Sequence, residues 1–327
     1  MKCHILFPFV DGPWGGGNQF LKAQRQEMMS RGVYCDDADR ADVVFTNSHH
    51  WLQQGLALKR RRPQVRIVHR IDGPVALIRR TRWTIDQLIF DYIREGADAV
   101  VFQSVWSREQ CLDGGLAMPA LCDTIVNAPD SRFFFKAPRS PANERIRLVA
   151  TSWSANALKG FDVYEALDRH LDFSRFEFTF IGNSPVPFSR ARHLAPLGQE
   201  ALGEELRRHD VYITGSVNDP CSNSLIEALH CGLPALARTS GGHPSIVGEQ
   251  GVLFDGPEDV LPAIERLTGA LELYRNRVNM PDIAAVTDRY LAVAEQSLVR
   301  PGKVVSATAL LPLRARIAWL KKRGMVS

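Results

Sequence analysis

Two patterns of hydrophobic and polar positions alternate along the chain. Short apolar runs rich in β-branched residues predict buried strands, and longer stretches with apolar residues at every third or fourth position predict amphipathic helices. In the first part of the chain, the expected elements are strands at residues 3–10, 41–47, 65–71 and 98–104 and helices at 18–32 and 82–96. Such alternation is typical of βα units that build a parallel sheet.

The apolar pattern stops between Lys136 and Arg145, where proline and charged residues take over, as expected of a linker. A second series follows, with strands expected at residues 146–152, 176–182, 210–216, 233–239 and 251–256 and helices at 160–171 and 200–209. The sequence therefore predicts an α/β protein with two doubly wound parallel-sheet domains, at residues 1–138 and 139–285.

Composition narrows the class of protein. With 327 residues, of which 45% are hydrophobic and 23% charged, the chain is expected to be soluble and globular. A net charge of +4 is modest for this length and argues against a nucleic-acid-binding protein. The six cysteines contain no CxxC pair, so we expect reduced thiols in an intracellular protein and no zinc site. No segment approaches the roughly 18 apolar residues of a membrane span.

Three consecutive glycines, Gly15 to Gly17, directly precede the first expected helix. Glycines at this point let backbone N–H groups approach an anion, and the helix N-terminus favours negative charge. The loop matches neither the GxGxxG dinucleotide pattern nor GxxxxGK[ST], which disfavours a Rossmann oxidoreductase. A phosphate cradle and a plain tight turn both remain open from these residues alone.

Two carboxylates flank a predicted helix start in the second part. Asp219 precedes the run "PCSNS", and Glu227 follows on a helix that should begin near Ser222 or Asn223. Glu227 lies about one turn beyond Asn223, on the same face, in an otherwise apolar stretch where a charge needs a partner. One carboxylate would thus reach a cleft from the loop and one from the helix, with free N–H groups between them suited to a diphosphate.

The stretch "DPCSNSLIEALHCGLPALARTSGGHPSIV" resembles the signature of the family 4 glycosyltransferases, the group 1 glycosyl transferases with the retaining mechanism and the GT-B fold. Further stretches that resemble this family are "VATSWSANALKGFD", "FIGNSP", "AVVFQSVWSRE", "VNAPDSRFF" and the glycine loop. The resemblance implies two Rossmann-like domains that face each other across a cleft. It also implies that residues 286–327 form a helix that crosses back to the first domain, followed by a basic tail.

The resemblance also implies residue roles. The implied catalytic residues are His69, at a strand end facing the reacting sugar, Asp219, which contacts the transferred sugar, and Lys159, on the diphosphate. The implied donor-binding residues are Gly16, Gly17, Lys159, Asn223, Ser224, Leu225 and Glu227, of which Glu227 holds the ribose hydroxyls. For a lone His at a strand end, a structural role is the alternative. There is no metal-holding DxD motif at the end of an expected strand, so no metal and no cofactor are expected.

Two positions depart from the family pattern. Asp219 replaces the usual Glu, and Trp153 and Ser154 stand where an Arg usually contacts the phosphates. Arg is not a group that Ser replaces, so another basic residue would have to serve. The alternatives are a sugar-nucleotide-binding protein with weakened catalysis and a GT-B phosphorylase or epimerase.

The expected activity is retaining transfer of a hexose-type sugar from a UDP- or GDP-linked donor to a glycan or lipid-linked acceptor, in the cytoplasm. The donor base, the sugar and the acceptor cannot be read from the sequence. Residues 312–327 add an amphipathic stretch in which Leu313, Ile317 and Leu320 share one helical face among basic residues. This tail predicts either a peripheral contact with an anionic membrane or a helix packed on the protein.

Overall fold

The structure is a computed structural model that describes residues 1–12, 15–138 and 144–324, with only the backbone described at 307–310. The chain forms two compact units. The first comprises Met1–Val10, Leu21–Val126 and Ala284–Ser327, and the second comprises Asp11–Phe20 and Asn127–Ile283. This division into compact units does not test the expected domain boundaries at residues 138 and 285, which stay predictions.

In the described residues, the first unit holds a parallel sheet in chain order. Its strands are β1 (Cys3–Leu6), β2 (Val43–Asn47), β3 (Arg66–Ile71), β4 (Ala99–Phe102) and β5 (Cys122–Thr124). The first four lie within the predicted segments. The sequence did not predict β5, because "CDT" has no apolar run. A parallel bridge joins Cys3 to Tyr34 as well, so pairing extends on both sides of β1.

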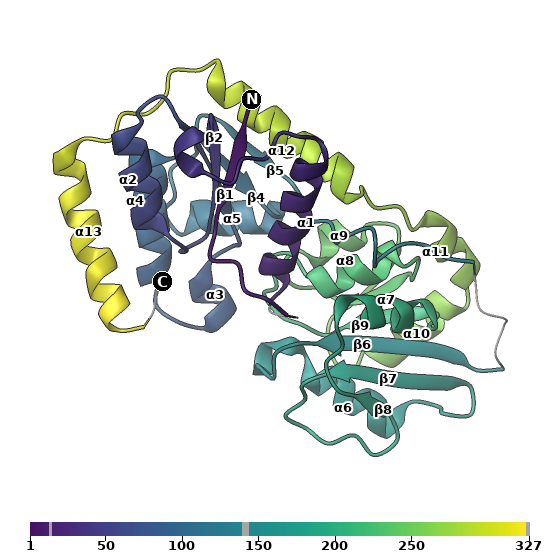
Figure 1. Cartoon of the computed structure of the whole chain (residues 1–327). Helices are drawn as coiled ribbons and strands as arrows, with labels where there is room; N and C mark the ends of the chain where they lie inside the picture. Colours follow the sequence, from purple (N-terminus) through teal and green to yellow (C-terminus); the bar gives the residue numbers. More distant parts are fainter. Residues whose placement is uncertain (13–14, 139–143, 325–327) are drawn as a thin grey trace. The chain divides into compact units, whose positions relative to one another are not determined.

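Helices cover this sheet and enclose the core of the first unit (Figure 1). They are α1 (Gly16–Ser30), whose first residues belong to the second unit, α2 (Leu52–Arg61), α3 (Val75–Arg79), α4 (Thr84–Gly96), α5 (Val105–Asp113), α12 (Ile283–Leu298) and α13 (Ala307–Lys322), with a short 3₁₀ turn at Ala38–Arg40. The predicted helices at 18–32 and 82–96 correspond to α1 and α4. Their buried faces repeat every three to four residues, as the pattern indicated.

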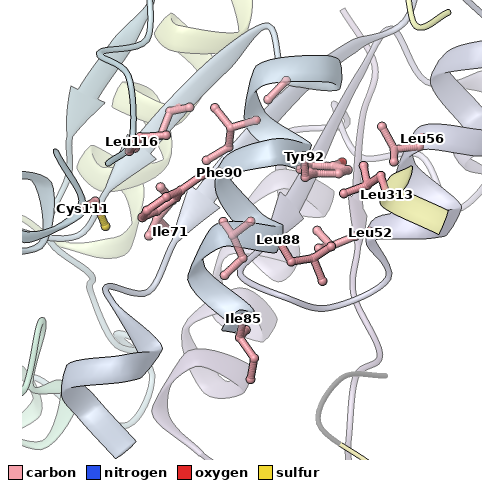
Figure 2. Close-up of a cluster of buried hydrophobic side chains, with 14 of the residues drawn as sticks. Leu52, Leu56, Ile71, Ile85, Leu88, Phe90, Tyr92, Cys111, Leu116 and Leu313 are labelled. Carbon is pink, nitrogen blue, oxygen red and sulfur yellow. The ribbon is translucent and has the colours of Figure 1, made fainter. Parts of the chain in front are cut away.

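The tail helix α13 closes the core of the first unit. Leu313, Ile317 and Leu320 are buried in the same cluster as residues of α2 and α4. Figure 1 shows α13 beside these two helices, and Figure 2 shows Leu313 next to Leu52 and Tyr92. The apolar face of the tail is therefore already covered, as in the packed-helix alternative. A membrane contact through residues 312–327 would have to use the exposed basic side chains, and residues 325–327 lie outside the described residues.

None of the helices in the part of the chain that the structure describes combines the length and the hydrophobicity needed to cross a membrane.

The second unit is built on a second parallel sheet, with the described strands in the order β11-β10-β9-β6-β7-β8. Their bounds are β6 (Ile146–Ser152), β7 (Phe176–Gly182), β8 (Arg192–Leu194), β9 (Val211–Thr214), β10 (Ala235–Arg238) and β11 (Gly251–Phe254). Five of them correspond to predicted strands, whereas β8 is short and exposed and was not predicted. The strand order reverses between β6 and β9, which makes their carboxyl ends the expected place for a ligand.

The helices of the second unit are α6 (Phe161–His170), α7 (Gln199–Arg207), α8 (Asn223–His230), α9 (His243–Val247), α10 (Val260–Thr268) and α11 (Leu271–Arg277), with a 3₁₀ turn at Ala157–Lys159. Buried aromatic residues of β7 and α6, including Phe178, Phe180 and Tyr164, fill the core beneath them. Two parallel-sheet α/β domains are thus present, which confirms the predicted fold class.

Candidate functional site

A cavity of about 340 Å³ lies at the carboxyl edge of the second sheet. Its lining includes Ser152, Gly182 and Thr214, the last residues of β6, β7 and β9, and also Gly15 and Gly16. The cavity is therefore located where the strand order reverses, at the position where open parallel sheets bind ligands.

The N-terminus of α8 forms one wall of this cavity. Ser222 is the N-cap residue and the helix begins at Asn223, as predicted. The backbone N–H groups of the first helical residues have no acceptor within a helix, so they remain available to a ligand. Asn223 and Ser224 line the cavity, whereas the side chain of Leu225 is fully buried in the core. Of Leu225, only the backbone can serve the predicted donor-binding role.

The glycine loop approaches α8 closely. Gly15 has a φ of +52°, and a Cβ at Gly16 would lie 2.3 Å from the Asn223 amide nitrogen Nδ2. The same Asn223 accepts a hydrogen bond through Oδ1 from Asn127 Nδ2 at 2.9 Å, which fixes its amide. Gly17 is the second residue of α1 and is not among the described residues of the cavity wall. A Cβ at Gly16 would therefore displace the Asn223 side chain, while the role predicted for Gly17 stays a prediction.

Lys159 and Asp219 form an ion pair in the cavity wall. Lys159 Nζ lies 3.0 Å from Asp219 Oδ2, and the backbone N–H of Cys221 donates to Asp219 Oδ1 at 3.3 Å. Burial opposes ionisation of Asp219, but the positive charge of Lys159 and the nearby His243 outweigh burial and lower the pKa of this carboxyl. The pair supplies a fixed cation beside the free N-terminus of α8.

Glu227 faces the same cavity from the first turns of α8. Burial raises the pKa of its carboxyl to about 8, with no cation nearby to oppose the effect. No hydrogen bond or ion pair to this carboxyl is found among the described residues. A half-buried carboxyl of this kind is costly for the empty protein, and it is suited to accept hydrogen bonds from the hydroxyl groups of a ligand.

The Gly-Gly-His-Pro stretch fixes the loop that carries Asp219. Gly241 has a φ of +61°, and a Cβ there would lie 2.3 Å from the Asp219 carbonyl oxygen. Gly242 N–H donates to the same oxygen at 2.8 Å. His243 is fully buried, with Nδ1 donating to the Arg238 carbonyl at 2.9 Å. The sequence analysis did not assign His243 a role, although the glycine pair before a helix start marked this tight contact.

Trp153 occupies the position at which the family pattern has an Arg. Its side chain is 41% exposed and lines the cavity together with Ser154. Among the described residues of the cavity wall, Lys159 is the only Lys or Arg. No other basic side chain of the described part of the second unit therefore lines the cavity in place of that Arg.

His69, for which the resemblance implied a catalytic role at a strand end, lies elsewhere than expected. His69 lies inside β3, two residues before its end, and is fully buried. Its Nδ1 is 2.8 Å from Thr46 Oγ1 and its ring centroid is 5.0 Å from that of Tyr92. Burial lowers the pKa of the imidazole to about 3, so the ring is neutral. Because no surface of His69 is open to a substrate, the structure favours the structural alternative.

Asp72, three residues later, is the polar group that the first sheet presents at its carboxyl edge. Its carboxylate accepts hydrogen bonds from Asn47 Nδ2 at 3.1 Å, from Gln103 Nε2 at 2.8 Å and from Arg70. These partners come from the ends of the neighbouring strands β2, β3 and β4, and the Asp72 side chain is still 32% exposed. The sequence analysis missed Asp72, although an Asp directly after a buried strand was a visible signal.

The structure also bears on metal binding. In residues 1–12, 15–138 and 144–324, no three His, Cys, Asp or Glu side chains gather in a way that could hold a metal ion.

Comparison with known sequences gives one match. Residues 153–269 match the family model described as Glycosyl transferases group 1. This segment contains Lys159, Asp219, Asn223 and Glu227, and thus most of the cavity wall. No curated protein sequence matches the chain.

Solved structures extend the likeness to the rest of the fold. HepE from Anabaena, in complex with UDP-glucose, is 14% identical at a TM-score of 0.65, with 99% of this chain and 100% of HepE covered. Sucrose-phosphate synthase from Thermosynechococcus elongatus is 16% identical at a TM-score of 0.60, with 88% and 78% covered. The catalytic domain of starch synthase IV from Arabidopsis thaliana, bound to ADP and acarbose, is 15% identical at 0.61, with 88% and 79% covered. The chain thus has the fold of the GT-B glycosyltransferases, and together with the match of residues 153–269 this fold supports a glycosyltransferase.

Proposed function

We propose that the chain is a retaining glycosyltransferase, which moves a hexose-type sugar from a nucleotide-diphosphate sugar to an acceptor hydroxyl without a metal ion. The observation that carries this proposal is the set of groups in one cavity of the second unit. Lys159 and the free N-terminus of α8 suit a diphosphate, and Glu227 has no partner among the described residues. A nucleotide-diphosphate sugar offers a group for each of them.

The leaving group defines what the cavity has to do. When the bond between the sugar carbon and the diphosphate oxygen breaks, negative charge develops on the diphosphate. Lys159 and the N–H groups at the start of α8 stabilise this charge. The acceptor hydroxyl forms the new bond on the same face of the sugar, and its proton passes to an oxygen of the departing diphosphate. Charge and protons balance, and no enzyme nucleophile is needed.

The two carboxylates bind the hydroxyl groups of the donor. Glu227 accepts hydrogen bonds from the ribose hydroxyls. Asp219 holds Lys159 toward the diphosphate through Oδ2 and still has lone pairs for hydroxyls of the transferred sugar. A UDP-linked donor is supported by the UDP-glucose complex of HepE, and the ADP complex of starch synthase IV shows that this fold also accepts other bases. GDP-linked donors belong in the same trial.

For the acceptor we propose a hydroxyl of a glycan or a lipid-linked sugar, as in polysaccharide biosynthesis. The proposed place of reaction is the cytoplasm, where nucleotide sugars are made, with a peripheral membrane contact for a lipid-linked acceptor. Support for the first unit as the acceptor side is the Asp72 carboxylate at the sheet edge, which is 32% exposed and held by hydrogen bonds from Asn47 and Gln103.

One observation favours a second candidate, a protein that binds the sugar nucleotide with weakened catalysis. Lys159 is the only Lys or Arg among the described residues of the cavity wall, and Trp153 stands at the position of the family Arg. Fewer cations stabilise less charge on the leaving group, and the loss falls on the rate of transfer more than on ground-state binding.

Incubation of the purified chain with UDP- and GDP-linked hexoses tests the proposal. We expect release of the nucleoside diphosphate and an acceptor glycoside with the donor's anomeric configuration, measured by NMR. The Lys159→Gln variant should lose this activity, while Arg169→Gln, an exposed cation of the same unit, should keep it. Binding without release identifies the weakened binding protein. A change of the donor sugar without release, or dependence on inorganic phosphate, identifies the epimerase or the phosphorylase.

A further inference from the structure

A second cavity, of about 280 Å³, lies at the opposite, amino edge of the second sheet. Arg147 lines it from the start of β6, Asp210 from just before β9 and Leu233 from just before β10. Arg275 of α11 completes the wall with Lys136. Because strands of a parallel sheet all start at this edge, the cavity is separate from the one proposed for the donor.

Two of the cations in this cavity share one carboxylate. Arg147 Nε lies 2.9 Å from Asp210 Oδ2, and Arg275 NH2 lies 2.5 Å from Asp210 Oδ1. Arg275 also pairs with Glu272 at 2.7 Å, but the Glu272 side chain is 64% exposed, whereas that of Arg275 is only 11% exposed. The carboxylate on the cavity wall therefore balances one of the two guanidinium groups, and the second carboxylate paired with Arg275 is largely exposed to solvent.

Two further cations in the wall face no carboxylate. Lys136 Nζ donates to the carbonyl of Val278, and Arg207 NH1 donates to the carbonyl of Phe133 at 2.7 Å. Neither side chain lies within ion-pair distance of an Asp or Glu among the described residues. A lysine has three N–H donors and an arginine has five, so both keep donors for a ligand.

The turn before β10 is shaped around Lys136. Gly232 has a φ of +88°, and a Cβ there would lie 3.3 Å from Lys136 Cγ. Arg207 is held in a similar way, because its guanidinium carbon stacks 4.2 Å from the centroid of the Phe135 ring. Both side chains therefore pack against neighbouring residues before a ligand binds. This packing lowers the conformational entropy that they lose on binding.

We propose that this cavity binds a small phosphorylated molecule through a phosphate or diphosphate group. Four cations, Lys136, Arg147, Arg207 and Arg275, line one cavity, and Asp210 is the acidic residue among the described residues of its wall. Planar guanidinium groups recognise phosphate oxygens in pairs, and an anion of two or more charges matches the excess of positive charge. This site is independent of the proposed donor site.

Titration with inorganic pyrophosphate by isothermal calorimetry tests this site. The titration uses the full chain with Lys159→Gln, so that the carboxyl-edge cavity lacks its cation, and chloride keeps the ionic strength constant. We expect one saturable site per chain. Adding Lys136→Gln and Arg207→Gln together should weaken the pyrophosphate affinity at least tenfold. Lys136→Gln alone should weaken this affinity about threefold or more, and because the Lys136 side chain is exposed, this substitution should leave the fold intact.

The matched control is Arg169→Gln, which removes an exposed cation of the same unit that pairs with Glu165. It should leave pyrophosphate affinity unchanged. Loss of binding in the Lys136 variants with binding kept in the control supports the site. Absence of saturable binding to the Lys159→Gln chain overturns it, and so does equal affinity with and without the Lys136 and Arg207 changes.

Discussion

The cavities proposed for the donor and for a phosphorylated molecule lie at opposite edges of the second sheet and differ in their balance of charge. Among the described residues of its wall, the carboxyl-edge cavity has one cation, Lys159, and two carboxyl groups, Asp219 and Glu227. The described wall of the amino-edge cavity has four cations and one carboxylate, Asp210. The cavity proposed for a nucleotide-diphosphate sugar is thus the poorer of the two in positive charge.

This difference separates two ways of holding an anion. At the amino edge, cationic side chains alone would bind the ligand, and such binding weakens with salt. At the carboxyl edge, the N–H groups of α8 share the diphosphate with Lys159, and the carboxyl groups bind neutral hydroxyls. The carboxyl-edge cavity should therefore select a molecule that carries hydroxyls and phosphates at a set spacing. If this is right, substitutions in one cavity should not affect binding in the other.

The largest expected effect comes from removing one cation, Lys159, which lines the carboxyl-edge cavity and not the amino-edge cavity. Lys159→Gln removes the ammonium that stabilises the leaving diphosphate, so transfer should fall by about 10²–10³-fold, as when one charge-stabilising donor is removed from an active site. Pyrophosphate binding at the amino edge should not change. Turnover and calorimetry on the same preparation measure both. Equal losses in both measurements would mean that the two cavities are not independent.

The next effect separates the two carboxyl groups of the donor cavity. If Glu227 binds the ribose, Glu227→Ala should weaken binding of the free nucleoside diphosphate by roughly 1.5–3 kcal/mol, because its hydroxyls lose a charged acceptor. If Asp219 acts on the transferred sugar and on Lys159, Asp219→Asn should leave this affinity nearly intact and reduce turnover. Calorimetry and turnover decide. A loss of nucleotide affinity in Asp219→Asn as large as in Glu227→Ala contradicts these roles.

The sequence predicted most of the second unit because its signals are local. Strand patterns, the N-cap at Ser222 and the Lys159 and Asp219 positions depend on residues near each other in the chain, and the structure has the strands and the helix start as predicted. The cavity at the amino edge was not predicted, since Lys136, Arg147 and Arg275 meet only when the sheet forms. These residues lie far apart in the sequence, so no local sequence pattern predicts that they line one cavity.

The first unit shows where the sequence misled. The resemblance implied a catalytic role for His69, whereas the residues alone left a structural role open, and the structure buries His69 against Tyr92. A strand that is buried on both faces shows no alternation of polar and apolar residues, so the sequence does not indicate whether a polar side chain in it is buried. The short strand β5 was missed for the opposite reason, as it has no apolar run to detect.

A smaller effect is expected from the glycine loop, which only the donor cavity has. Gly16→Ala places a Cβ 2.3 Å from the Asn223 amide, so Asn223 must move and donor affinity should fall by roughly 1 kcal/mol or more. The matched experiment is a double-mutant cycle with Asn223→Ala, which removes the clashing group. The combined change should cost less than the sum of the single changes. Additive losses would show that the contact with Asn223 is not the reason for glycine at this position.

The smallest effect concerns pH and the carboxyl group that has no cation beside it. Burial raises the pKa of Glu227 from 4.5 to about 8, so between these values the folded chain keeps a proton that the unfolded chain has released. The free energy of unfolding must therefore fall as the pH rises through this window. Glu227→Gln does not titrate. It should match the parent's melting temperature below about pH 4.5 and exceed it by a margin that grows until about pH 8, with about 2–4 °C for each roughly 1 kcal/mol that the parent loses. Differential scanning calorimetry of both chains measures this, and saturation with nucleoside diphosphate should narrow the gap, because ligand hydroxyls stabilise the ionised carboxylate of the parent. Parallel curves from pH 6 to 9 would mean that Glu227 is already ionised and solvated in the empty cavity, and the charge contrast between the two edges would then be larger, because the carboxyl edge would carry one more negative charge.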